Sequence, residues 1–205
     1  MPALTVVVPT ISGREESLAR AIASYEDTLR DGPSHEIVLI KDAPTWPSAC
    51  NEGYKKSKGD ILHFTADDLE ALPGWWEPAL AHLKEHNELP APRVYDYRPD
   101  GKFANEEDGE DGAITHFTRI PIMTRAQYEA IGPWPIIDYF ADLWVSEKAR
   151  VLGIETRMVY GYDFVHHWSQ IGRVDSKENL DNSGYALNRL RLQMDRRRRW
   201  KPIRR

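Results

Sequence analysis

The chain has few of the features that mark secreted proteins, proteins with structural metal sites, or membrane proteins. Its 205 residues include one cysteine, Cys50, which excludes an internal disulfide and any zinc site built from several cysteines. No apolar run approaches the length of a membrane span, and the N-terminus lacks the basic region and apolar core of a signal peptide. With 41% hydrophobic and 29% charged residues, the composition predicts a soluble globular domain, and we expect it in the cytoplasm.

Two common nucleotide-binding motifs are also missing. The polar loop at residues 11–16 follows the first predicted strand and precedes the first predicted helix. This is the place where a P-loop or a Gly-x-Gly-x-x-Gly fingerprint would stand, yet the loop has the spacing of neither. The sequence therefore disfavours Walker-type NTPases and dinucleotide enzymes.

Positive charge is concentrated at the C-terminus. The last ten residues carry six Arg and one Lys, and removing these seven charges from the net charge of -5 leaves -12 on the rest of the chain. A basic tail on an acidic body could contact nucleic acid, anionic lipid or an acidic partner, and a solubilising tail is an equally good interpretation. We divide the chain into a domain at residues 1–175 and a helical basic tail at 176–205.

Predicted strands and helices alternate over the first 65 residues. The β-branched, apolar run at 4–8 is typical of a central parallel strand that is buried on both faces. Further strands at 36–40 and 61–65 follow helical patterns at 17–25 and 48–58, the second starting at Ser48 and stopped by Gly59. This order predicts a parallel sheet with right-handed crossovers. Later patterns predict helices at 77–86 and 125–131, a helix ending near 150, a helix at 179–199, and strands at 93–97, 113–117, 119–124 and 154–160.

Acidic side chains follow the third predicted strand. Asp67, Asp68 and Glu70 lie within four residues, at the end of a strand where open α/β sheets bind ligands. Such a cluster repels itself unless a cation is present, and its hard oxygen ligands suit Mg2+ or Mn2+ holding substrate phosphates. A solvated acidic loop is the alternative. Asp42, which ends the second strand, is placed to bind a base or ribose hydroxyl or to cap a turn.

Together these segments resemble the inverting family 2 glycosyltransferases of the GT-A fold. The similarity covers residues 4–167 in order and is carried by VVVPT at 6–10, SLARAIAS at 17–24, Asn51 with Gly53, KGDILHF at 58–64, PGW at 73–75, and the segments 124–132 and 141–153. It implies an α/β, Rossmann-like fold with a mixed sheet flanked by helices. It also implies a hexosyltransferase-type enzyme that uses a nucleotide-diphosphate sugar.

The resemblance assigns roles to individual residues. Those implied to bind the nucleotide sugar are Pro9, Thr10, Asp42, Asn51 and Asp67. Asp68 would hold Mn2+ or Mg2+, with His166 or His167 completing the metal site. Asp142 would be the general base that removes the acceptor proton, although Asp also often caps a helix. Trp75, Trp134 and Asp138 are candidates for acceptor contact, and both tryptophans could instead anchor the core.

Two positions and one interval depart from the family pattern. Ala66 stands where the first Asp of Asp-x-Asp would fall, and Ala141 replaces the usual acid before Asp142. The interval between Asp42 and Asn51 is also short, which predicts the loss of one strand and its crossover. A nucleotidyltransferase function is therefore an alternative, although the chain lacks the Gly-rich, basic first loop expected of such an enzyme. These departures also leave open a non-catalytic nucleotide- or nucleic-acid-binding module that uses the basic tail.

Overall fold

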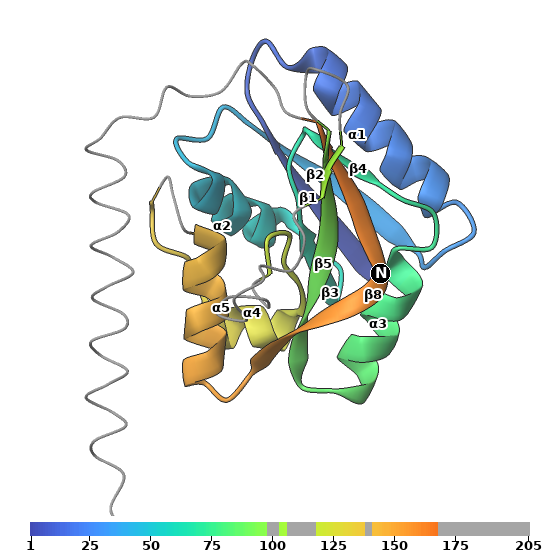
Figure 1. Ribbon diagram of the computed structural model, residues 1–205. Helices are drawn as coiled ribbons and strands as arrows, with labels where there is room; N and C mark the ends of the chain where they lie inside the picture. Colours follow the sequence, from blue (N-terminus) through green and yellow to red (C-terminus); the bar gives the residue numbers. More distant parts are fainter. Residues whose placement is uncertain (98–102, 106–117, 138–140, 168–205) are drawn as a thin grey trace, which may run out of the picture.

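The computed structural model describes residues 1–97, 103–105, 118–137 and 141–167, which form two four-stranded sheets flanked by helices (Figure 1). The first sheet has the order β2-β1-β3-β7, formed by β1 (Leu4–Thr10), β2 (His35–Lys41), β3 (Ile61–Phe64) and β7 (Ile122–Thr124). β1 pairs in parallel with β2 and β3, and β7 runs antiparallel to β3. The predicted α/β class and the first three parallel strands are therefore confirmed.

The second sheet has the order β4-β8-β5-β6. Its strands are β4 (Leu69–Ala71), β5 (Glu88–Tyr97), β6 (Phe103–Asn105) and β8 (Glu155–His167). The long β8 pairs antiparallel to β4 and parallel to β5. Because β4 begins directly after the acidic residues that follow β3, this sheet brings the end of β8 next to the acidic segment.

The five helices of the described residues flank the two sheets and belong to two hydrophobic clusters, which take up side chains from opposite faces of β1 (Figure 1). On one side, α1 (Glu15–Thr28) and α3 (Trp76–Glu85) pack with Val6 and Val8 in a core that includes Tyr25 and Phe164. On the other side, α2 (Trp46–Lys56), α4 (Arg125–Ile131) and α5 (Ala141–Val151) pack around Val7. Alternate side chains of a strand point to opposite faces, so burial of both sets explains why β1 is apolar throughout.

A glycine sets the close approach of α2 to β1. A Cβ atom on Gly53 would lie 2.2 Å from Cγ1 of Val7, which is far inside van der Waals contact. Any side chain here would push the helix away from the sheet. The same helix carries Cys50, which is fully buried, and burial raises the pKa of its thiol well above the ordinary value. Cys50 is therefore a small core residue of this helix.

Several predicted boundaries were wrong. The second helix begins at Trp46, because Thr45 is the N-cap and Ser48 is its reciprocal partner in a capping box. It ends at Lys56, so Gly59 lies outside it and instead packs against the backbone of Thr5. Strand β4 was not predicted, and the strand expected at 119–124 is confined to Ile122–Thr124. The predicted strand at 113–117, Asp138 and the tail at 176–205 lie outside the described residues.

No helix in the described part of the chain is long and apolar enough to cross a membrane.

Candidate functional site

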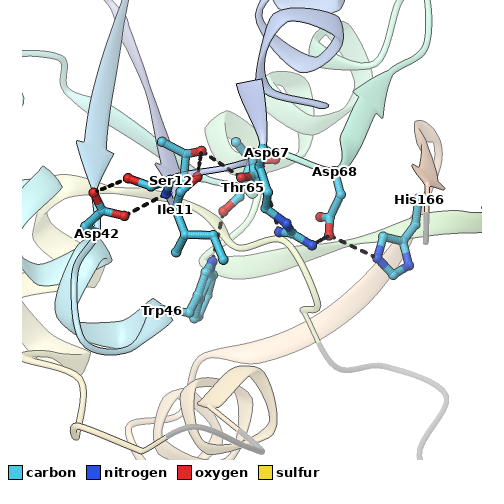
Figure 2. A network of polar contacts seen from close by, with 10 residues as sticks. Ile11, Ser12, Asp42, Trp46, Thr65, Asp67, Asp68 and His166 are labelled. Atoms are coloured by element: carbon cyan, nitrogen blue, oxygen red, sulfur yellow. Dashed lines mark hydrogen bonds and ion pairs between the residues drawn. The ribbon is translucent and has the colours of Figure 1, made fainter. Parts of the chain in front are cut away.

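The candidate site lies where the parallel strands of the first sheet end. β1, β2 and β3 run in the same direction, so Thr10, Asp42 and the segment after Phe64 meet at one edge. The order β2-β1-β3 means that the chain crosses over β1 between the second and third strands. Ligands of open α/β sheets bind at such a switch point, outside the carboxyl ends of the strands. Figure 2 shows polar contacts across this edge.

Asp67 bridges the ends of β1 and β3. Its side chain is buried, and Oδ2 accepts a 2.7 Å hydrogen bond from the Thr10 hydroxyl, which is also buried. Burial raises the pKa of Asp67 above its ordinary value, even though the Thr10 hydrogen bond and the Arg14 charge oppose the shift. Thr10 and Asp67, both expected to bind the nucleotide sugar, thus lie in contact with each other, and their contact with a nucleotide stays a prediction.

Arg14 joins the two aspartates and was missed by the sequence analysis. It is the N-cap residue of α1, and its Nη1 donates to Oδ1 of Asp67 at 2.6 Å while Nη2 donates to Oδ2 of Asp68 at 3.1 Å. The partners lie more than fifty positions away in the sequence. The available signal was one arginine in the loop after β1, a loop whose position in α/β folds faces the ends of neighbouring strands.

Asp68 connects the first sheet to the end of β8. Its Oδ2 lies 3.7 Å from Nε2 of His166, and β4 pairs Leu69 with His166 in the adjoining ladder. Burial alone would raise the pKa of Asp68, but the polar contact with His166 and the charges of His166 and Arg14 outweigh it and lower that pKa. The carboxylate is therefore held in its ionised form.

The second histidine has a different partner. Nε2 of His167 lies 2.7 Å from Oε2 of Glu70, and its backbone N–H donates to the Asp68 carbonyl at 2.8 Å. Neighbouring residues of a strand point to opposite faces, which separates the two imidazoles. Of the two histidines that the sequence left as alternatives, His166 is the one whose ring meets Asp68.

The chemistry of this pair suits a divalent cation. One carboxylate and one imidazole are ligands that Mn2+ accepts, and such ions take their remaining ligands from substrate phosphates and water. In the described part of the chain, no group of three or more His, Cys, Asp or Glu side chains could hold a metal by itself. Asp68 and His166 therefore fit a cation that arrives with phosphate ligands, and they do not form a closed structural metal site.

Asp42 occupies the far end of the same edge. Its backbone has a positive φ of 56°, and its carboxylate accepts hydrogen bonds from the Ser12 N–H at 2.7 Å and the Ser12 hydroxyl at 2.8 Å. These two hydrogen bonds lower the pKa of Asp42. The residue is exposed at the surface and ties the loop after β1 to the loop after β2, as Figure 2 shows.

Asn51 and Trp134 form one hydrogen-bonded unit. The Asn51 side chain donates to the Trp134 carbonyl and accepts from the Trp134 N–H, both at 2.9 Å, and it also accepts from the Tyr128 hydroxyl. Trp134 stacks on Trp46 with ring centroids 5.2 Å apart and is 2% exposed. Asn51 thus anchors the segment that carries Trp134, and its nucleotide contact stays a prediction.

Both candidate acceptor tryptophans are core residues. Trp75 is fully buried, donates its indole N–H to the Thr28 hydroxyl at 3.0 Å and packs against Tyr25. Trp134 is buried as described above. Neither ring presents an exposed face, which favours the core role of the two roles that the sequence left open, and acceptor contact stays a prediction. Pro9 lies in β1 opposite Ile40, and its donor contact stays a prediction.

Asp142 lies in the first turn of α5. Its Oδ1 accepts a 2.8 Å hydrogen bond from the Leu143 N–H, and the side chain is partly exposed. A carboxylate in this position is stabilised by the N-terminal end of the helix dipole. The helix-capping interpretation therefore has a physical basis here, and the role of general base stays a prediction.

Comparison with known families agrees with this geometry. The model of glycosyl transferase family 2 matches residues 45–149, just over half of the chain, and this range includes Asp67, Asp68 and Asp142. A search of curated proteins finds no match. The mixed sheets flanked by helices are consistent with the GT-A fold, and the matched domain supports nucleotide-sugar glycosyltransferase activity in general. The chain belongs to glycosyl transferase family 2.

Proposed function

We propose that this chain is a metal-dependent, inverting glycosyltransferase that moves a sugar from a nucleotide-diphosphate sugar to an acceptor hydroxyl. The observation that carries the proposal is the meeting of Thr10, Asp42, Asp67 and Asp68 at the switch-point edge, with His166 reaching the same carboxylate from the second sheet. This edge offers hydrogen-bond acceptors for a nucleoside and ligands for a cation, side by side.

The donor would lie along the edge from Asp42 to Asp68. Asp42 is ionised and exposed, so it can accept from a base or a ribose hydroxyl while Ser12 holds its orientation. Thr10 at the end of β1 and Asp67 after β3 lie further along the same edge, where the ribose would pass toward the diphosphate. The diphosphate would then meet Asp68 and His166. Because each carboxylate is fixed by neighbours, little reordering is needed when the donor binds.

The leaving group defines the need for a cation. When the bond between the anomeric carbon and the diphosphate breaks, its electron pair goes to the departing nucleoside diphosphate. A divalent cation bound by Asp68 and His166 would supply Lewis-acid stabilisation of that charge. The lowered pKa of Asp68 keeps this ligand ionised without the cation.

Asp142 is the proposed base. The acceptor oxygen attacks the anomeric carbon from the face opposite the leaving diphosphate, and the acceptor proton passes to the Asp142 carboxylate. The resulting glycosidic bond has inverted configuration, since only one displacement occurs. One carboxylate within hydrogen-bond reach of the acceptor is enough for this step.

Nucleotide binding tests the proposed donor site. We expect Mn2+ to strengthen the binding of one of UDP, GDP and dTDP. We expect Asp68→Ala to lower the affinity for that nucleotide in the presence of Mn2+ by at least about tenfold, which is the effect typical of losing a metal ligand or a residue that supports one. Isothermal titration with Mn2+ and then with chelator measures both effects.

Asp60→Ala is the matched control, because this exposed aspartate lies just before β3, at the end of the strand away from the site. It should bind nucleotide as the wild type does. A wild-type chain that binds none of the three nucleotides under either condition would overturn the proposed function. Equal metal-dependent nucleotide binding by wild type and Asp68→Ala would show that Asp68 is not a metal ligand.

A further inference from the structure

We infer that Arg14 acts as a resident cation of the donor site, that is, a positive charge that is present before any ligand binds. Its guanidinium weakens metal binding before the donor arrives and then helps to hold the diphosphate. This inference rests on the proposed function, because it assigns a further residue to the same site. Neither the predicted ligand set nor the matched range at 45–149 includes Arg14.

The guanidinium spans two carboxylates. Nη1 contacts Asp67 and Nη2 contacts Asp68, so each nitrogen serves a different acid. The side chains of Arg14, Asp67 and Asp68 are 15%, 2% and 14% exposed, so both ion pairs are largely shielded from water. Charges in such surroundings interact more strongly than on an open surface, since solvent screens them less.

The charge balance explains why an arginine stands here. Two adjacent carboxylates repel each other, and the guanidinium stays protonated at every physiological pH. With Arg14 in place, the group of Arg14, Asp67 and Asp68 carries one net negative charge; without it, the group carries two. The arginine thus offsets part of the negative charge that the two carboxylates bring to the donor-free site.

The same contact opposes a metal ion. Nη2 lies 3.1 Å from Oδ2 of Asp68, the oxygen that also faces His166. A divalent cation that approaches this oxygen meets a positive charge already beside it, and the repulsion lowers its affinity. A nucleoside diphosphate adds several negative charges, so a cation and Arg14 can then be accommodated together.

The guanidinium also has donor capacity left for phosphate. It carries five N–H groups, of which the two aspartates use two, and the buried Nε–H has no acceptor among the described residues. Arginine binds phosphate through directed hydrogen bonds as well as through charge. A diphosphate at Asp68 would therefore lie within the field of this cation.

Arg14→Gln gives the test, because the inference predicts effects of opposite sign. The affinity for Mn2+ alone should rise by about tenfold or more, since the competing charge is gone. The affinity for UDP, GDP or dTDP, whichever binds the wild type, should fall by about tenfold or more in chelator, since the resident cation is lost. Mn2+ titration followed by electron paramagnetic resonance and nucleotide titration by calorimetry measure the two arms.

Two variants serve as controls. Arg14→Lys keeps the charge and should bind Mn2+ nearly as weakly as the wild type, and Arg20→Gln removes an exposed arginine of α1 and should change neither affinity. If Arg14→Gln fails to fold, the double variant Arg14→Gln/Asp67→Asn restores the charge balance. Compared with Asp67→Asn alone, it should still show the loss of chelator-resistant nucleotide binding.

The outcomes separate the inference from the proposed function. Wild-type nucleotide binding with no rise in Mn2+ affinity in Arg14→Gln would overturn the inference and leave the donor site standing. Loss of both affinities would show that Arg14 only maintains the fold of the site. A wild-type chain that binds no nucleotide would overturn the proposed donor site and the inference together.

Discussion

Asp142→Asn is expected to slow sugar transfer by about 10²- to 10⁴-fold, the range typical of a lost general base. Asparagine keeps the size of the side chain and its oxygen can still accept the Leu143 N–H, so α5 should keep its first turn. What disappears is the ability to take the acceptor proton. Nucleoside diphosphate affinity should stay within about twofold, because the base does not form part of the donor site.

The measurement is release of nucleoside diphosphate from the donor sugar, with water or a screened hydroxyl compound as acceptor. Glu147→Gln is the matched control, since this acid lies on the same helix and forms a surface ion pair with Arg150. It should retain the wild-type rate. A rate for Asp142→Asn within about threefold of wild type would rule out Asp142 as the base and leave it as a helix-capping residue.

His63 is expected to make the protein strongly sensitive to acid. It is fully buried between Tyr25 and Tyr162, whose hydroxyls lie 3.1 and 3.3 Å from its ring nitrogens. Burial lowers its pKa from 6.5 to about 3. Between these values the unfolded chain takes up a proton that the folded chain does not, so stability falls as pH falls through this window. The loss across the window is on the order of 5 kcal/mol.

Denaturant unfolding of wild type and His63→Phe between pH 3.5 and 7 isolates this contribution. Phenylalanine cannot titrate, and both tyrosines keep their other acceptors, Thr65 and the Ile120 carbonyl. We expect the variant to lose most of the slope below pH 6.5. His86→Gln, an exposed histidine at the end of α3, should keep the wild-type slope. Equal slopes for wild type and His63→Phe would contradict the burial argument.

The sequence predicted the central sheet well because its signals are local. Continuous apolar runs at β1 and β3 can only be buried on both faces, and helical patterns between them require crossovers in one direction. From this alone it followed that Asp42 and Asp67 would end at one edge. The helix Arg125–Ile131 was also predicted at its observed bounds, and in the structure Thr124 caps its first turn.

The rest depended on contacts between distant segments. The pairing of Arg14 with Asp67 and Asp68 is set by how α1 packs on the sheet, and no local pattern encodes it. Burial of Trp75 and Trp134 likewise follows from tertiary packing, since a tryptophan after a turn suits either a core or a ligand. Strand β4 was missed because its three residues owe their extended form to pairing with β8.

The most direct test of the donor site is to map nucleoside diphosphate binding on the ¹⁵N-labelled protein by two-dimensional NMR. The account predicts that the amide shifts of residues 10–14, 42 and 65–68 change most, and that Mn2+ then broadens signals around Asp68 and His166. Shift changes confined to the basic tail at 196–205, with none at the ends of β1 to β3, would contradict it.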